Sequence, residues 1–385
     1  MDTSTTDLDA TEGRVHPRPG DTSLAEALLP TPHPANHASF VQLLPDGSLG
    51  CTWFAGSEEG RPDVYIYFSR LPPGADRWLP AVRVSCDEKH SEQNPVLACL
   101  PDGTLWLAYT AQVRGAQDTA VVKVQRSDDL GATWSAPRPL FDTPGIFIRH
   151  GLVQLTEERW LLPVFHCHSL PGRQWDGDWD TSAVAVTEDA GRTWRQVEVP
   201  ESTGVVHMCI VPLKDGTLAA FFRSRWADAV HRSESTDGGE TWSAPVALDV
   251  PNNNSSLQVA RVGAEDDELL MVLNPVAAPP GSAEGDRVVP ETEGKVTAEG
   301  EIEPLRRHAV WGTPRLPLSL MRSTDRGLTW SRVLDLETEA PESIVRVEFS
   351  YPALVPGPGG EAHITYTYGR DAIKYVRVPR ERIAG

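Results

Sequence analysis

One eight-residue pattern, Ser/Thr-x-Asp-x-Gly-x-Thr-Trp, occurs four times in this chain. The copies start at Ser127, Thr187, Ser235 and Ser323. Each copy predicts a tight hairpin turn, because its Asp can accept hydrogen bonds from turn amides, its Gly supplies a positive φ, and its Trp packs at the edge of a sheet. A supersecondary unit that returns along one chain indicates a repeat architecture rather than unrelated domains.

Short apolar and β-branched runs precede each turn, and in three of the units an Asp-Gly turn joins the first two runs. Six units can be traced, and the last lacks a fourth strand of its own. The segment from Leu24 to Leu29 is predicted to supply that strand. The fold class predicted is therefore all-β, a six-bladed β-propeller of four-stranded antiparallel blades, with seven blades as the alternative.

Composition divides the chain into a tail and one domain. Residues 1–22 are rich in Thr, Asp, Gly and Pro and are predicted to be a disordered tail. Residues 23–385 are predicted to form a single propeller domain, with a Gly/Pro/Glu-rich insertion at about 277–308 that is either a lid or a solvated loop.

Charge and cysteine content bound the partners and the compartment. The net charge of −19 argues against binding to nucleic acid or to an anionic membrane. Five scattered cysteines with no CxxC pair indicate reduced thiols and a cytoplasmic location. No signal peptide and no membrane span are expected, since no apolar run is long enough. No cofactor is expected, and the oligomeric state is left open.

The residues that open the first strands are the strongest functional signal, because the innermost strand of a propeller blade lines the channel. Asn94 and His207 each lie eight residues before the Asp of the next Asp-Gly turn, and His37 lies nine before it. The full set is His37, Asn94, His150, His207, Asn253 with Asn254, and Tyr351. Such a polar set is costly to bury unless a ligand or water uses it. The alternative is that these side chains bond to one another around a water-filled axis.

Loops after the second strands carry carboxylates, Arg and Trp, which together are the chemistry of a sugar site. These residues are Glu58, Glu59, Asp63, His166, His168, Trp175, Asp176, Asp178, Asp180, Arg223, Arg225, Trp226 and Asp228. The two histidines of this set have the spacing of a pair of metal ligands on one strand face. A third ligand would have to come from another blade, so no metal site is predicted.

The repeated turns resemble the Asp-box, or BNR, repeats of the sialidase superfamily, over nearly the whole chain. Further segments are similar to the predicted-neuraminidase branch of bacterial sialidase-like proteins. These segments are Asn36–Ser39, Glu59–Val64, Asn94–Pro95, Asn274–Pro275, Glu348–Ala353 and Tyr366–Tyr368. The resemblance implies a retaining glycosidase with a Tyr nucleophile paired with a Glu, an Asp acid/base and three Arg that clamp a substrate carboxylate.

Carried over by position, the resemblance makes Tyr351 the nucleophile. It makes Arg315 one arginine of the clamp, with Arg223 or Arg232 as another. Glu59 or Asp63 occupies the loop of the acid/base, and Arg370 is taken as a further anion contact. His37, Asn94, His150 and Asn254 complete the predicted substrate-binding set.

Two departures from the family pattern bear on activity. His37 stands where sialidases have an Arg-Ile-Pro motif, and His207 stands where they have the Glu that activates the tyrosine. His207 would then act as the base toward Tyr351. The function predicted is a sialidase-like glycosidase acting on a terminal sugar that carries a carboxylate, with a glycan or small molecule as partner. A lyase using His and Tyr, and a non-hydrolytic propeller that binds a glycan, a protein or another small molecule, are the alternatives.

Overall fold

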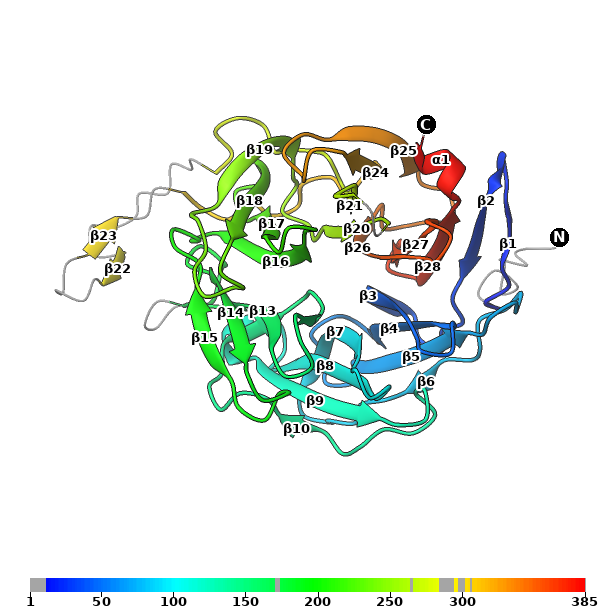
Figure 1. Ribbon diagram of the computed structural model, residues 1–385, viewed down its shortest axis with the longest axis horizontal. Helices are drawn as coiled ribbons and strands as arrows, with labels where there is room; N and C mark the ends of the chain where they lie inside the picture. The colour runs from blue at the N-terminus through cyan, green and yellow to red at the C-terminus, as the bar shows by residue number, and fades with distance from the viewer. Residues whose placement is uncertain are drawn as a thin grey trace.

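The computed structural model describes residues 12–169, 174–263, 266–283, 294–296, 302–304 and 307–384. Within these residues, six antiparallel sheets surround a central axis, as Figure 1 shows. The fold is a six-bladed β-propeller of four-stranded blades, which confirms the predicted fold class. No helix of the described residues is long and apolar enough to cross a membrane.

Strands are given from the inner to the outer strand of each blade. The first blade consists of β3 (Ala35–Leu43), β4 (Leu49–Gly56), β5 (Tyr65–Leu71) and β6 (Val82–Arg83), and the second of β7 (Ser91–Cys99), β8 (Leu105–Gln112), β9 (Val121–Ser127) and β10 (Arg138–Pro139). The third blade consists of β11 (Ile146–Ile148) with β12 (Val153–Gln154), then β13 (Trp160–His166), β14 (Thr181–Thr187) and β15 (Arg195–Glu198). A short 3-10 helix, η2 (Gln117–Thr119), follows β8.

The fourth blade consists of β16 (Val205–Pro212), β17 (Leu218–Ser224), β18 (Ala229–Ser235) and β19 (Val246–Pro251), and the fifth of β20 (Gln258–Arg261), β21 (Leu269–Leu273), β24 (Leu318–Ser323) and β25 (Ser331–Glu337). The sixth blade consists of β26 (Phe349–Pro356), β27 (Ala362–Tyr368), β28 (Ala372–Val378) and β2 (Asp21–Leu28). The chain ends in a short helix, α1 (Arg380–Ala384).

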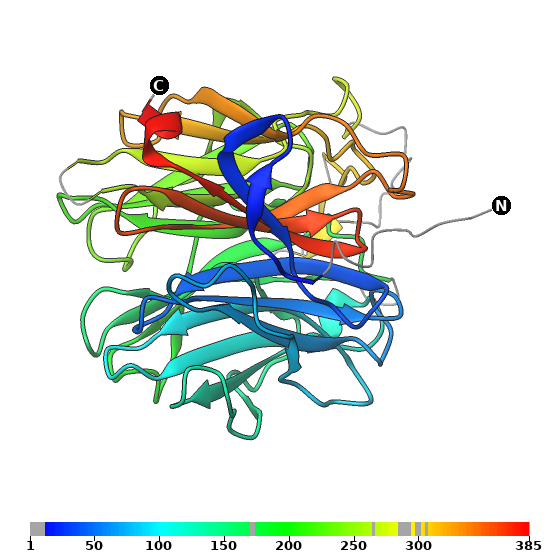
Figure 2. The ribbon, with the colours of Figure 1, turned by 90° about the vertical axis from the view of Figure 1, so that its right-hand side faces the viewer.

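Strand β2 closes the ring, as the sequence predicted. It pairs with β28 from Ala25 opposite Arg377 to Leu28 opposite Lys374. Figure 2 shows this N-terminal strand beside the C-terminal strands of the last blade. The two ends of the chain therefore share one sheet, and β2 is the fourth strand of the last blade.

The predicted tail is wrong over part of its length. Residues 16–18 form β1 (His16–Arg18), which pairs with β2, and β2 itself starts at Asp21. Arg18 lies near Glu26 and donates to the carbonyl oxygen of Leu336. This edge hairpin was missed because its residues are polar and lack an alternating apolar pattern. Residues 1–11 lie outside the described residues.

The repeated turns join the third strand to the fourth strand of a blade, as predicted. In the second blade, Asp129 accepts hydrogen bonds from the amide of Thr133 (2.8 Å) and the hydroxyl of Ser127 (2.8 Å). Gly131 has a φ of 88°, and a Cβ there would lie 2.2 Å from the ring of Phe68 in the first blade. The turn thus packs against the neighbouring blade and requires a glycine at that contact.

The insertion predicted at about 277–308 lies partly outside the described residues. Its described part includes β22 (Gly294–Val296) and β23 (Ile302–Pro304), which form a separate two-stranded sheet. The chain rejoins the propeller through His308, whose ring is 2.7 Å from a carboxylate oxygen of Asp178 in the third blade.

Candidate active site

The start of the inner strand carries a residue with left-handed backbone geometry in five blades. The φ values lie between 49° and 56° at Ala38, Asn94, His207, Asn254 and Tyr351. Four of these residues lie at a shift in pairing between the first two strands of their blade, which is a bulge that redirects the side chain. A non-glycine residue in this conformation costs about 1 kcal/mol or more, so the recurrence marks positions where side-chain direction matters.

The first blade differs from the predicted set by one residue. The left-handed position is Ala38, not His37, which explains why His37 lies nine residues before its turn instead of eight. His37 is nevertheless buried beside the site. Its Nδ1 is 2.8 Å from the hydroxyl of Thr367, and its ring centroid is 4.3 Å from that of Tyr351.

Tyr351 is half-buried at the inner end of the sixth blade. Nη1 of Arg223 donates a hydrogen bond of 2.7 Å to its hydroxyl oxygen. Arg223, from the fourth blade, is only 1% exposed and also donates from Nε to Asn254 of the fifth blade (2.8 Å). Arg223 therefore links two other predicted residues, Asn254 and Tyr351, from two other blades. Nη2 of Arg223 is buried and has no hydrogen-bond partner among the described residues.

Arg149 holds the backbone of Tyr351 from the opposite side of the ring of blades. Its Nη2 donates to the carbonyl oxygens of Tyr351 (3.0 Å) and Pro352 (3.1 Å), and its other nitrogens donate to Ser256 and to the carbonyl of Ser39. This buried arginine of the third blade thus joins the first, fifth and sixth blades. Arg149 was not predicted as a site residue, because only its neighbour, His150, has the matching position before the next turn.

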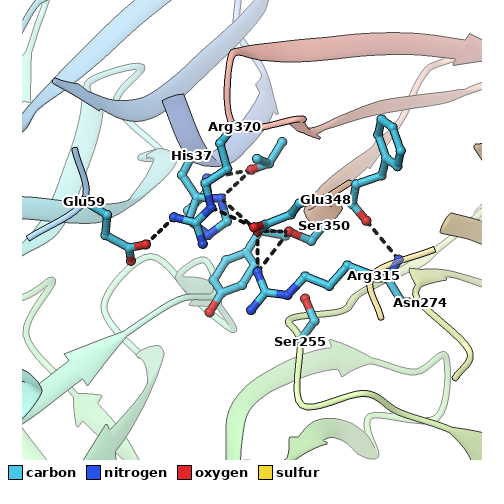
Figure 3. Close-up of polar contacts among 12 residues, drawn as sticks. His37, Glu59, Ser255, Asn274, Arg315, Glu348, Ser350 and Arg370 are labelled. Atoms are coloured by element: carbon cyan, nitrogen blue, oxygen red, sulfur yellow. Dashed lines mark hydrogen bonds and ion pairs between the residues drawn. The ribbon is translucent and has the colours of Figure 1, made fainter. Parts of the chain in front are cut away.

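Glu348 lies between two of the predicted anion contacts. Its carboxylate accepts hydrogen bonds from Nη1 of Arg315, from Nε of Arg370 (2.8 Å) and from the hydroxyl of Ser350 (2.7 Å). Figure 3 shows Glu348 between the two guanidinium groups. Burial opposes the charge on Glu348, but Arg315 and Arg370 outweigh it and lower the pKa of this carboxyl to about 2. Its segment was part of the resemblance, yet no role was predicted for it.

Glu59 and Asp63, the two candidate acids, lie in different surroundings. Glu59 is exposed, accepts from Nη1 of Arg370, and lines a cavity of about 600 Å³ together with His37, Gln93 and Arg370. Asp63 lies outside that cavity and accepts from the hydroxyl of Ser57 (2.9 Å). Of the two carboxylates, Glu59 is the one that the structure places beside the predicted anion contacts.

The three predicted histidines are buried and neutral. Burial lowers the pKa of His37 and of His207 well below the usual value, and nearby arginines lower both further. Burial likewise lowers the pKa of His150 to about 3, and its Nδ1 is 3.0 Å from Gln258. The ring of His207 is 5.9 Å from that of Tyr351 between centroids. Its role as the base stays a prediction, because the bonded partner of the phenol is an arginine.

The phenol of Tyr351 is tuned by its cationic neighbours. Burial raises the pKa of Tyr351, whereas Arg223 and Arg315 lower it by more, and the result is a pKa below its usual value. The guanidinium carbon of Arg315 lies 5.5 Å from the ring centroid, and that of Arg149 lies 5.4 Å from it. These cations favour the phenolate form of the side chain.

Arg232 and Asn94, two further residues predicted to bind substrate, lie in different surroundings. Arg232 is not part of the site, since it lies on β18, the third strand, where it pairs with Glu234 (3.1 Å) and reaches the carbonyl of Arg326. Asn94 is buried in the second blade, and its side-chain oxygen has no hydrogen-bond partner in the part of the chain that the structure describes.

Aromatic side chains form the rim next to Arg223. Trp311 is 48% exposed, and its ring lies 5.9 Å from the guanidinium carbon of Arg223 and 6.0 Å from the ring of Trp175. The buried pair of Arg225 and Asp180 (2.6 Å) supports these rings from below. Trp175, Asp180, Arg223 and Arg225 were predicted in loops after the second strands, whereas Trp311 was not predicted.

No group of three His, Cys, Asp or Glu able to hold a metal ion occurs among the described residues. His166 and His168 have stacked rings with centroids 5.9 Å apart, and Nε2 of His166 is 3.7 Å from Glu198.

The fold and the site define a class: propellers with a tyrosine and several arginines at the inner ends of their blades. A family model described as a BNR repeat-like domain matches residues 47–364. The chain therefore belongs to this family, within the sialidase and BNR-repeat superfamily, and the predicted resemblance is confirmed. No curated protein matches the chain in a comparison of sequences.

Several solved structures share the fold at low sequence identity. The Hadza microbial sialidase Hz136 has a TM-score of 0.68 at 16% identity, over 90% of this chain and 66% of that chain. A protein of unknown function from Dyadobacter fermentans has a TM-score of 0.67 at 16% identity, over 91% and 97%. The intramolecular trans-sialidase from Ruminococcus gnavus, in complex with oseltamivir carboxylate, has a TM-score of 0.64 at 13% identity, over 99% of each chain. At these identities the likeness concerns the fold.

Proposed function

We propose that this chain is a sialidase-like glycosidase that cleaves a terminal, carboxylate-bearing sugar with Tyr351 as its nucleophile. The observation that carries the proposal is the 2.7 Å hydrogen bond from Arg223 to the phenolic oxygen, in surroundings that lower the phenol's pKa. A tyrosine nucleophile is an established exception among glycosidases. Free thiols at all five cysteines support the proposed cytoplasmic location.

In the proposed reaction, the oxygen of Tyr351 attacks the anomeric carbon as the bond to the leaving oxygen breaks. His207 is the proposed acceptor of the phenolic proton, and Glu59 is the proposed donor to the leaving oxygen. Glu59 is held by Arg370 in this structure, so substrate binding must loosen that pair before Glu59 can reach the leaving oxygen. Water then releases the sugar from the tyrosine with retention of configuration.

The proposed anion contact is Arg223. Its Nη2 lies buried beside the phenol with no hydrogen-bond partner among the described residues, and a buried unpaired donor is costly until a ligand accepts from it. Trp311, exposed at the rim, offers an apolar face to a sugar ring.

The test is turnover of a fluorogenic α-sialoside by the purified chain, beside uronides and neutral glycosides. Tyr351→Phe should lower kcat by about three orders of magnitude, because it removes the nucleophile. Tyr109→Phe is the matched control, since Tyr109 is buried in the second blade against Gln125 and should leave kcat unchanged. Release of an unsaturated sugar would instead indicate a lyase. Binding of a glycoside without turnover would indicate a binding propeller.

A further inference from the structure

The arginines around Tyr351 are not equivalent in charge. Arg315 and Arg370 share the carboxylate of Glu348, and Arg370 also pairs with Glu59. Two cations thus face two anions, and this part of the site is electrically balanced. Arg223 has no carboxylate partner among the described residues, and its hydrogen bonds go to a phenol and an amide. Arg149 also has no carboxylate partner among the described residues, but its nitrogens donate to Ser256 and to three carbonyl oxygens. Of the two, Arg223 is the arginine with an unpaired buried donor.

Glu348 is a permanent part of this arrangement. It is 7% exposed, and the hydroxyl of Ser350 donates to the same oxygen that accepts from Arg315. Its backbone also joins Arg315, since the amide of Phe349 donates to the carbonyl of that arginine (3.2 Å). With a pKa of about 2, the carboxylate stays charged at any pH near neutrality. An incoming carboxylate at Arg315 and Arg370 would thus meet a fixed negative charge.

We infer that Glu348 is a specificity-determining residue, whose carboxylate occupies the anion-binding position between Arg315 and Arg370 and leaves Arg223 to bind the substrate's acidic group. The inference rests on the proposed function for its substrate class. It predicts that the site binds an acidic sugar through one arginine, and thus less tightly than an open pair of arginines would. Removing the charge of Glu348 should convert Arg315 and Arg370 into a carboxylate site.

The experiment measures binding by calorimetry and therefore does not depend on turnover. The probes are N-acetylneuraminic acid and its uncharged methyl ester, with native chain, Glu348→Gln and Glu268→Gln. Glu348→Gln should bind the acid about tenfold tighter and the ester unchanged, because two charge-assisted contacts become available. Glu268→Gln is the matched control, since Glu268 is likewise buried between two arginines, Arg322 and Arg380, but lies away from the site. It should bind like the native chain.

Single arginine variants give a second reading in a chain that keeps Glu348. Arg223→Met should weaken binding of the acid about tenfold, whereas Arg315→Met should change it less than about twofold. A tenfold loss in Arg315→Met, or no gain for the acid in folded Glu348→Gln, would overturn the inference. Because Arg223→Met and Arg315→Met both keep Glu348, their affinities for the acid also test the inference if Glu348→Gln does not fold.

A small-anion probe separates this inference from the proposed function. In Glu348→Ala, acetate should raise the midpoint of thermal unfolding beyond an equal concentration of chloride, since it can replace the missing carboxylate. The native chain should show a smaller difference, because Arg315 and Arg370 are already paired there and only the donor of Arg223 is open to the anion. If neither sugar binds but acetate stabilises Glu348→Ala, then the proposed sugar substrate is wrong and the role of Glu348 stands. If acetate has no effect either, the inference is wrong.

Discussion

At the residue scale, the pKa of Tyr351 depends on the arginines that face its phenol. Arg315 lies near the phenol but shares Glu348, whereas Arg223 bonds to the phenol and has no carboxylate partner among the described residues. Burial alone would raise the pKa of a tyrosine, as it does for Tyr109 and Tyr375 in this chain. The lowered pKa of Tyr351 is therefore a product of its partners and not of its depth.

We predict that Tyr351 ionises before the other buried tyrosines and that Arg223→Met raises its pKa above the usual value of 10. Ultraviolet absorbance of tyrosinate, recorded against Tyr351→Phe, isolates this one phenol. Because its folded pKa lies below its unfolded pKa, ionisation favours the folded state, and this contribution is lost as pH falls through the folded pKa. Arg232→Met is the matched control and should leave the titration unchanged. An unchanged titration in Arg223→Met would contradict the assigned cause.

At the element scale, two recurring devices divide the work of each blade. The inner strands use a left-handed residue to direct a side chain toward the axis, as at His207 and Tyr351. The outer turns use an Asp to order a loop, as at Asp237, which accepts from Ser235, Glu240 and Thr241. The left-handed residue positions a side chain of the site, and the Asp stabilises the turn of the sheet. Mutations at the first should therefore change ligand binding, and mutations at the second should change the free energy of unfolding.

We predict that Asp237→Ala lowers the free energy of unfolding by about 1 kcal/mol, because several donors of the turn lose their protein acceptor and must bond to water instead. Asp237→Asn should cost less, since its amide oxygen can still accept. Urea unfolding followed by tryptophan fluorescence gives both values. Binding of the acidic sugar should be the same in both variants, and a loss of binding would show that the turn and the site are coupled.

At the scale of the whole molecule, the ring is held closed at its edge and across its axis. Strand β2 completes the last blade beside β28, and Arg149 spans the centre from the third blade to three others. The apolar face of β2 packs into the core shared by the first and last blades, where Ala27 is 1% exposed. Loss of that contact would open the last blade and disturb the strand that carries Tyr351.

We predict that Ala27→Asp destabilises the fold on the order of 3 kcal/mol, because it buries a charge without a partner. Thr22→Asp, at an exposed position of the same strand, should be close to neutral. Thermal and urea unfolding of the two variants decide this. Equal stability in the two variants would mean that β2 does not hold the ring closed.

The blades could be predicted from the sequence, because turns and strands are specified by neighbouring residues. The Asp and Gly of each box, and the alternation of the runs before it, act over a few positions, and they were enough to predict the closing strand near Leu24 to Leu29. Spacing from a turn also located Asn94 and His207, since a fixed distance along a strand becomes a fixed height in the channel, and Tyr351 was predicted as the residue that opens the inner strand of the last blade. Residues 16–22, the polar part of the edge hairpin, were not predicted as strand because they lack apolar alternation.

The partners of those residues could not be predicted from the sequence, because they come from distant parts of the chain. Arg149 and Tyr351 are 202 positions apart, and Arg223 and Tyr351 are 128 apart, so no local pattern relates them. Arg223 and Arg232 were equal candidates in the sequence, yet one is on a second strand facing the axis and the other is on a third strand facing a neighbouring blade. Glu348 had no visible role until Arg315 and Arg370 were seen on either side of it. Contacts across a closed ring depend on how the blades meet, and that geometry is a property of the whole fold.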